Sequence, residues 1–112
     1  GTINLEAMKK ASECLLGEHD FTAFCGKLEP NVSPVRVIEA IDISKEGDMI
    51  TINVTGRSFL FRMVRVITGT LLDVGKGSLP VDDVQKILES KDKNEMRAAA
   101  PAQGLTLVCV EY

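Results

Sequence analysis

The stretch SFLFRMVRVITGTLLDVG, from Ser58 to Gly75, constrains the fold more than any other part of the chain. Its apolar residues recur with helical spacing, which predicts a long core helix that ends near the glycines Gly75 and Gly77. The same stretch carries Arg62 and Arg65 about one turn apart. A guanidinium among apolar neighbours is tolerated only beside a carboxylate or phosphate. The stretch therefore predicts an anionic partner as well as a helix.

On a helical wheel, one narrow polar stripe runs along this predicted helix, formed by Ser58, Arg62, Arg65, Gly69 and Asp73. Glycine inside a helix costs about 1 kcal/mol relative to alanine, so Gly69 indicates that another part of the protein packs close to the backbone. Most charged stripes are solvated faces. On the residues alone, an ordinary ion pair, internal or at the surface, is therefore the favoured interpretation of the arginines.

The rest of the chain alternates between helix and strand signals. Asn4 can cap a first helix that Gly17 would end, and Pro80 can open a third. Two runs rich in β-branched residues predict antiparallel strands joined by a tight turn, and a last strand follows the loop APAQG. The predicted elements cover residues 5–16, 35–45, 50–55, 58–75, 80–88 and 105–112. This order predicts a single α+β domain over residues 1–112, an antiparallel sheet with helices packed on one face.

The segment GEHDFTAFCG predicts a short helical turn in which Asp20 accepts hydrogen bonds from the following amides. His19 and Asp20 could suggest an acid/base pair, but adjacent residues rarely point at one substrate atom. A role in ordering the loop is therefore favoured. Phe21 and Phe24 could stack on bases, although core packing is the favoured interpretation.

Composition excludes several classes of protein. Cys14, Cys25 and Cys109 form no CxxC pair and are odd in number, which predicts reduced thiols, with Cys109 buried on the last strand. His19 is the only histidine and has no metal-ligand spacing around it, so no metal is predicted. No apolar run is long enough for a membrane helix and no signal-peptide pattern is present, which predicts a soluble cytoplasmic protein.

The charge is unevenly distributed along the chain. The formal net charge is −3, yet residues 56–77 hold four cations and one anion, a balance of +3. One basic face on an acidic body is compatible with nucleic-acid binding. Arg57, Arg62 and Lys76 are candidates for phosphate contacts, and plain solvation of these side chains is the open alternative.

Three segments, in this order and spacing, resemble the C-terminal half of the TruA-type tRNA pseudouridine synthases. They are GEHDFTAF, GRSFLFRMVRVITGTLLDVGKG and AAAPAQGLTLVCVEY, and the resemblance runs from about Leu5 to Tyr112. In that family an aspartate nucleophile lies in the N-terminal half, in a segment R-T-D-x-G-V-H-A that this chain lacks. The resemblance therefore implies half of an enzyme whose cleft lies between two related α+β halves.

The resemblance also implies roles for individual residues. Arg65, the arginine of the MVR segment, would pair with the missing aspartate, and Leu105 would form an apolar wall of the uracil pocket. The whole enzyme would isomerise uridine in the tRNA anticodon arm without a metal or redox cofactor. Its partners would be tRNA, its own N-terminal half and a second copy of itself. Arg62 departs from the family, where histidine is frequent, which weakens any specific role carried over to it.

Two other hypotheses stay open at this stage. One is a self-sufficient α+β domain that binds a small molecule or a protein, with Arg62 and Arg65 as an anion site. The other is a domain with only a structural or dimerising role. A longer reading frame that contains the R-T-D-x-G-V-H-A segment upstream of Gly1 would decide for the enzyme half.

Overall fold

The computed structural model describes residues 3–47, 49–98 and 106–111, the last of these as backbone only. Seven helices and strands alternate with three short 3₁₀ turns in this part of the chain. They are α1 (Leu5–Ser12), η1 (Glu13–Leu15), β1 (Gly17–Asp20), η2 (Thr22–Phe24), β2 (Val35–Glu46), β3 (Met49–Gly56), α2 (Met63–Gly75), α3 (Val81–Ser90), η3 (Lys93–Glu95) and β4 (Thr106–Glu111).

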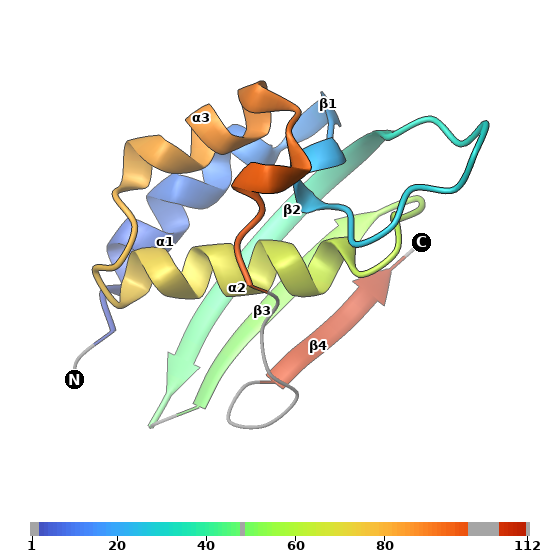
Figure 1. Ribbon diagram of the computed structural model, residues 1–112. Coiled ribbons are helices and arrows are strands. Elements are labelled where there is room, and N and C mark those ends of the chain that lie inside the picture. Colours follow the sequence, from blue (N-terminus) through green and yellow to red (C-terminus); the bar gives the residue numbers. More distant parts are fainter. Residues whose placement is uncertain (1–2, 48, 99–105, 112) are drawn as a thin grey trace.

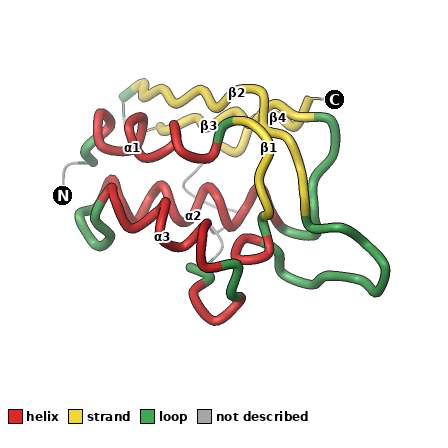
Figure 2. The backbone as a smooth tube through the Cα atoms, turned by 90° about the horizontal axis from the view of Figure 1, so that it is seen from above, coloured by secondary structure: helices red, strands yellow, loops and turns green. Residues whose placement is uncertain are grey.

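The sheet has the strand order β1-β2-β3-β4, and the helices lie on one of its faces (Figures 1 and 2). The predicted α+β fold is confirmed. The first three strands pair antiparallel, whereas β4 pairs parallel to β3. The chain crosses from β3 to β4 through α2 and α3 rather than through a hairpin, and a crossover of that kind brings the last strand back in the same direction.

The alternation along β3 separates the two faces of the sheet, as the sequence predicts. Ile50, Ile52 and Val54 are buried under the helices, while Thr51, Asn53 and Thr55 on the other face are partly exposed. The core that results combines both layers. It is formed mainly by Met8, Leu15, Phe21, Phe24, Ile38, Ile52, Val54, Met63, Val66, Ile67, Leu71 and Val84.

The N-terminal helix starts as predicted but ends earlier. The Ala7 amide donates to the Asn4 carboxamide at 3.0 Å, which caps α1. The helix stops at Ser12, and Gly17 takes a left-handed φ of 91°. The predicted short helical turn at Phe21 and Phe24 is confirmed as η2. Residues 17–20 form β1 against β2, a strand that the sequence did not predict.

The long helix begins at Met63, and the prediction that it begins at Ser58 is wrong. Arg62 has a left-handed backbone, with φ 60° and ψ 10°, immediately before α2. A residue in that conformation interrupts a right-handed helix. Ser58 and Arg62 therefore lie outside the helix, and the predicted polar stripe keeps only Arg65, Gly69 and Asp73.

The first helix packs closely on the end of α2. A Cβ atom on Gly75 would lie 2.6 Å from Met8 Sδ and 2.8 Å from Ile3 Cγ2. The Asn4 amide donates to the Gly75 carbonyl at 2.8 Å, which fixes the two backbones together. Gly75 therefore leaves room for the side chains of Met8 and Ile3, which an added Cβ would displace.

We expect Gly75→Ala to lower the free energy of unfolding by about 2 kcal/mol, because the added methyl group overpacks a filled site. Urea denaturation of the 112-residue chain measures the change. Ser78→Ala, at an exposed position just beyond α2, is the matched control and should change the free energy by less than about 0.5 kcal/mol. An unchanged midpoint for Gly75→Ala would show that α1 and α2 are not held at this distance in solution.

Candidate active-site residues

Arg65 is the third residue of α2 and is partly buried. Its helical neighbours Met63, Val64 and Val66 are buried in the core, so the position of its backbone is set by packing. The connection from β3 leads directly into this turn of the helix. The exposed loop 27–34 lies at the same end of the molecule (Figure 1). The packing of the first turn of α2 thus fixes the backbone that carries the Arg65 side chain.

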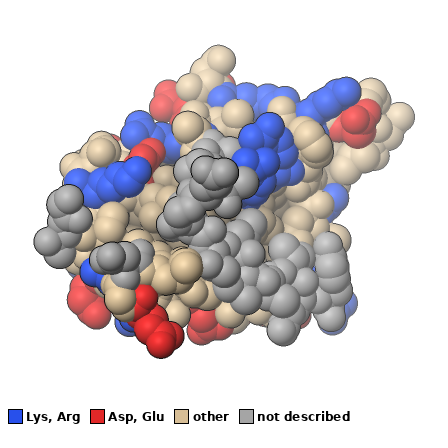
Figure 3. All heavy atoms as spheres, turned by 90° about the horizontal axis from the view of Figure 1, so that it is seen from below, with Lys and Arg blue, Asp and Glu red and all other residues tan. Residues whose placement is uncertain are grey.

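The structure brings two of the three predicted RNA-binding residues to this end of α2. Arg57 and Arg62 are exposed and lie on the connection between β3 and α2. Lys76 is also exposed but follows the opposite end of the helix, roughly 20 Å away for a helix of this length. Seen from below, Lys and Arg side chains gather along the upper part of the surface (Figure 3). Lys76 therefore belongs to a different part of the surface from the two arginines.

Asp73, the last charged residue of the predicted stripe, forms an ion pair within the domain. The Nε of Arg97 donates to Asp73 Oδ2 at 2.9 Å, and both side chains are largely shielded from solvent. This pair joins the end of α2 to the segment that follows η3. No local pattern could have identified it, because the two residues lie far apart in the sequence.

The polar residues Asp20 and His19 of the segment GEHDFTAFCG form local hydrogen-bonding contacts. Asp20 Oδ1 accepts hydrogen bonds from the Thr22 amide at 2.9 Å and from the Thr22 hydroxyl at 2.6 Å. This confirms the predicted loop-ordering role of Asp20. His19 Nε2 lies 2.7 Å from the Leu16 carbonyl oxygen, within hydrogen-bonding distance. Phe21 and Phe24 are fully buried, which confirms core packing rather than base stacking.

Sequence reasoning did not identify a contact between this segment and the start of α2. The Gly26 amide donates to the Phe61 carbonyl at 2.9 Å. A Cβ atom on Gly26 would lie 3.2 Å from Arg62 Cδ and 3.3 Å from Phe61 Cδ1. Gly26 therefore lies directly against the left-handed turn that precedes Arg65. The sequence gives no direct signal for this contact, since Gly26 lies two residues beyond the family-like segment GEHDFTAF.

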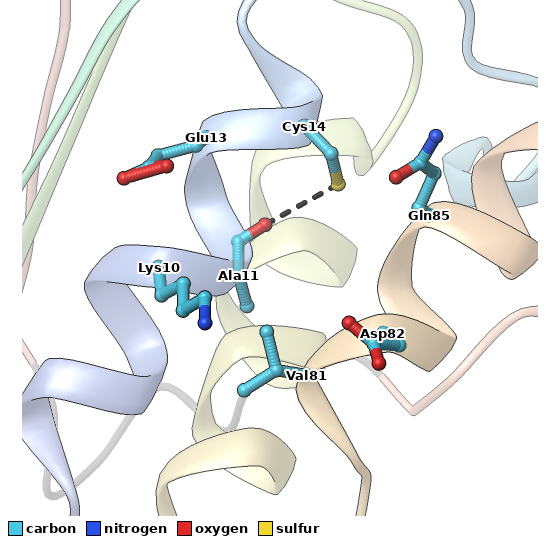
Figure 4. A pocket seen from close by; sticks show the side chains of 7 residues that line it. All are labelled: Lys10, Ala11, Glu13, Cys14, Val81, Asp82 and Gln85. Atoms are coloured by element: carbon cyan, nitrogen blue, oxygen red, sulfur yellow. Dashed lines mark hydrogen bonds between the residues drawn. The ribbon is translucent and has the colours of Figure 1, made fainter.

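A separate pocket of about 340 Å³ opens between α1 and α3 (Figure 4). The residues that line it are Lys10, Ala11, Glu13, Cys14, Val81, Asp82 and Gln85. Burial raises the pKa of the Cys14 thiol, and the charge of Glu89 raises it further. The thiol also donates to the Ala11 carbonyl at 3.3 Å. Cys14 is thus protonated at neutral pH and is a poor nucleophile.

Two predicted residues fall outside what the structure describes. Leu105, the predicted wall of the uracil pocket, lies outside the described residues, and so does the side chain of Cys109. Among the residues that are described, no three His, Cys, Asp or Glu side chains could together hold a metal ion. In the same part of the chain, no helix has both the length and the apolar character needed to span a bilayer.

The α+β fold is consistent with one half of a pseudouridine synthase. A family model described as tRNA pseudouridine synthase matches residues 11–112. The chain is 41% identical over 110 residues to proteins named tRNA pseudouridine synthase A from Brucella ovis and from Brucella suis. The aligned region is 98% of this chain and 44% of each relative. The chain belongs to the TruA-type tRNA pseudouridine synthase family, and it spans less than half the length of these relatives.

Proposed function

We propose that this chain is the C-terminal, RNA-binding half of a tRNA pseudouridine synthase, and that it completes the active site of the whole enzyme. The observation that carries the proposal is the family match over residues 11–112 in a chain that spans only 44% of its relatives. The chain contains no R-T-D-x-G-V-H-A segment. The nucleophilic aspartate therefore comes from an N-terminal half of the same protein.

Arg65 is the residue that completes the active site. A carboxylate that attacks uridine must stay ionised in a partly dehydrated cleft, and a neighbouring guanidinium lowers its pKa and fixes its direction. Arg65 suits this role because the packing of α2 holds its backbone while the side chain is only partly buried. The reaction breaks the N-glycosidic bond, rotates the base and rejoins it through carbon. No oxidation or reduction occurs, so no redox cofactor is required.

The RNA face of this half is centred on Arg57 and Arg62. Both are exposed at the end of α2 where Arg65 lies, so phosphates held there would place a uridine near the active site. Lys76 would contact a more distant part of the same tRNA. The full protein is a cytoplasmic homodimer that acts on the anticodon arm, with Leu105 as an apolar wall of the uracil pocket.

The 112-residue chain alone should not convert uridine to pseudouridine in unmodified tRNA, because it lacks the nucleophile. The assay is mass spectrometry of nucleosides after incubation, with the full-length protein as positive control. Pseudouridine formed by the purified chain would contradict the proposal that the second half supplies the aspartate.

The isolated chain should bind tRNA weakly, with an affinity that falls as salt increases, because phosphate contacts release counterions. Arg57→Glu should weaken binding and reduce the slope of log affinity against log salt by about one or more. Glu6→Gln, which alters an exposed charge on α1 near the opposite end of α2, is the control. Equal binding by Arg57→Glu and the unsubstituted chain would remove Arg57 from the RNA face.

Arg65→Met in the full-length protein should lower the single-turnover rate by more than about a hundredfold while the tRNA dissociation constant changes little. Methionine keeps much of the apolar stem, but the aspartate loses its partner, a loss on the order of 3–5 kcal/mol for a buried pair. Arg65→Lys should restore only part of the rate, because an ammonium cannot form the bidentate contact.

Quench-flow measurements at saturating tRNA separate these effects on rate from effects on binding. Arg62→Met serves as the neighbouring control and should change the dissociation constant more than the rate. Near-normal catalysis by Arg65→Met would assign Arg65 a structural role only.

A further inference from the structure

We infer that Gly26 is a positioning residue for catalysis, and that the segment from Asp20 to Gly26 holds the start of α2 in the place that aligns Arg65. This inference rests on the proposed function, because it assumes that Arg65 is the catalytic arginine. It assigns a role to the GEHDFTAFCG segment, whose His19 and Asp20 take no part in the proposed chemistry.

The backbone before α2 is strained and must be held by its surroundings. Arg62 takes a left-handed φ of 60° although it is not glycine, and no side chain caps the helix at this point. Such conformations persist only where neighbouring structure determines them, and they cluster at active sites. Within the turn, the Met63 amide donates to the Leu60 carbonyl at 3.0 Å and the Val66 amide donates to the Arg62 carbonyl at 3.0 Å. The turn is thus continuous with the helix that carries Arg65.

Gly26 supplies the external contact that holds this turn. Its amide donates to the Phe61 carbonyl at 2.9 Å, between the two bonds that close the turn. The space for a side chain is already taken, since a Cβ on Gly26 would lie 3.2 Å from Arg62 Cδ and 3.3 Å from Arg62 Cβ. Gly26 does not have a positive φ, so the requirement for glycine comes from this close approach and not from backbone conformation.

Gly26 is itself anchored through the preceding residues. Phe24 and Cys25 are fully buried, and their amides donate to Phe21 and Thr22 carbonyls at 2.8 Å and 3.2 Å. Asp20 caps the same turn with two hydrogen bonds to Thr22. The contacts therefore run without a break from the sheet edge at β1, through η2, to the turn before Arg65. A shift of a few tenths of an ångström at Gly26 passes directly into the first turn of α2.

The test is a double-mutant cycle in the full-length protein, in which Gly26→Ala is made alone and together with Arg62→Gly. Gly26→Ala should lower the single-turnover rate at saturating tRNA by about tenfold or more, because small misplacements of a catalytic group cost large factors in rate. The dissociation constant of tRNA should change less than twofold. The Arg62→Gly background removes Cβ and Cδ of residue 62 and leaves only the Phe61 ring near the added methyl group, so the same Gly26→Ala change should cost clearly less in rate there.

Gly75→Ala is the matched control at the far end of α2, where a Cβ also meets a filled site. It should lower the melting temperature without lowering the rate of the folded enzyme. If Gly26→Ala does not fold, Asp20→Ala replaces it. That change should lower the rate, and Asp20→Asn should restore it because the carboxamide oxygen can accept both bonds from Thr22.

The outcomes separate the inference from the function on which it rests. A normal rate for Arg65→Met overturns the proposed function and the inference together. Loss of rate in Arg65→Met, with a normal rate for Gly26→Ala, overturns the inference alone. An equal cost of Gly26→Ala in both backgrounds also overturns it, because the contact with Arg62 would then not transmit the effect.

Discussion

The burial of α2 among the elements on one face of the sheet is the constraint on which the rest of the structure depends. This helix is apolar on most of its surface, and nearly all of its residues between Met63 and Gly75 are buried. A helix of that kind is stable only when other elements cover it. The strand residues Ile50, Ile52 and Val54 provide one cover and Met8 of α1 another. The exposed ends of α2 are then the places where polar residues can act.

Much of the fold follows from sequence periodicity. The β-branched residues that predict β2, the alternation that predicts β3 and the cap at Asn4 are local signals, and all three are confirmed. The errors have non-local causes. Arg62 interrupts the helical run with a left-handed backbone beside Gly26 of a distant segment, and residues 17–20 form a strand that pairs with β2. The parallel direction of β4 depends on where two helices lead the chain, which periodicity does not encode.

The residues of the candidate site also divide into those that local sequence suggests and those that only the tertiary structure reveals. The apolar neighbours of Arg65 predict an anionic partner, but the resemblance to the family is what singles this arginine out as a candidate. Gly26 could not be selected, because its importance lies in the atoms of Arg62 and Phe61 that approach it across the fold. The pairing of Asp73 with Arg97 is likewise a product of the tertiary structure. The sequence therefore points to the arginine proposed for catalysis, and the tertiary structure points to the residues proposed to position it.

The parallel pairing of β4 with β3 has a consequence for how the domain folds during synthesis. The three antiparallel strands and α2 can associate as soon as they leave the ribosome, because their contacts are close in sequence. β4 is the last element of the chain to emerge, and it must find an edge made much earlier. Until then the edge of β3 has unpaired backbone groups, which makes the nascent chain prone to strand-to-strand aggregation. The emergence of β4 from the ribosome is thus the event that completes the sheet.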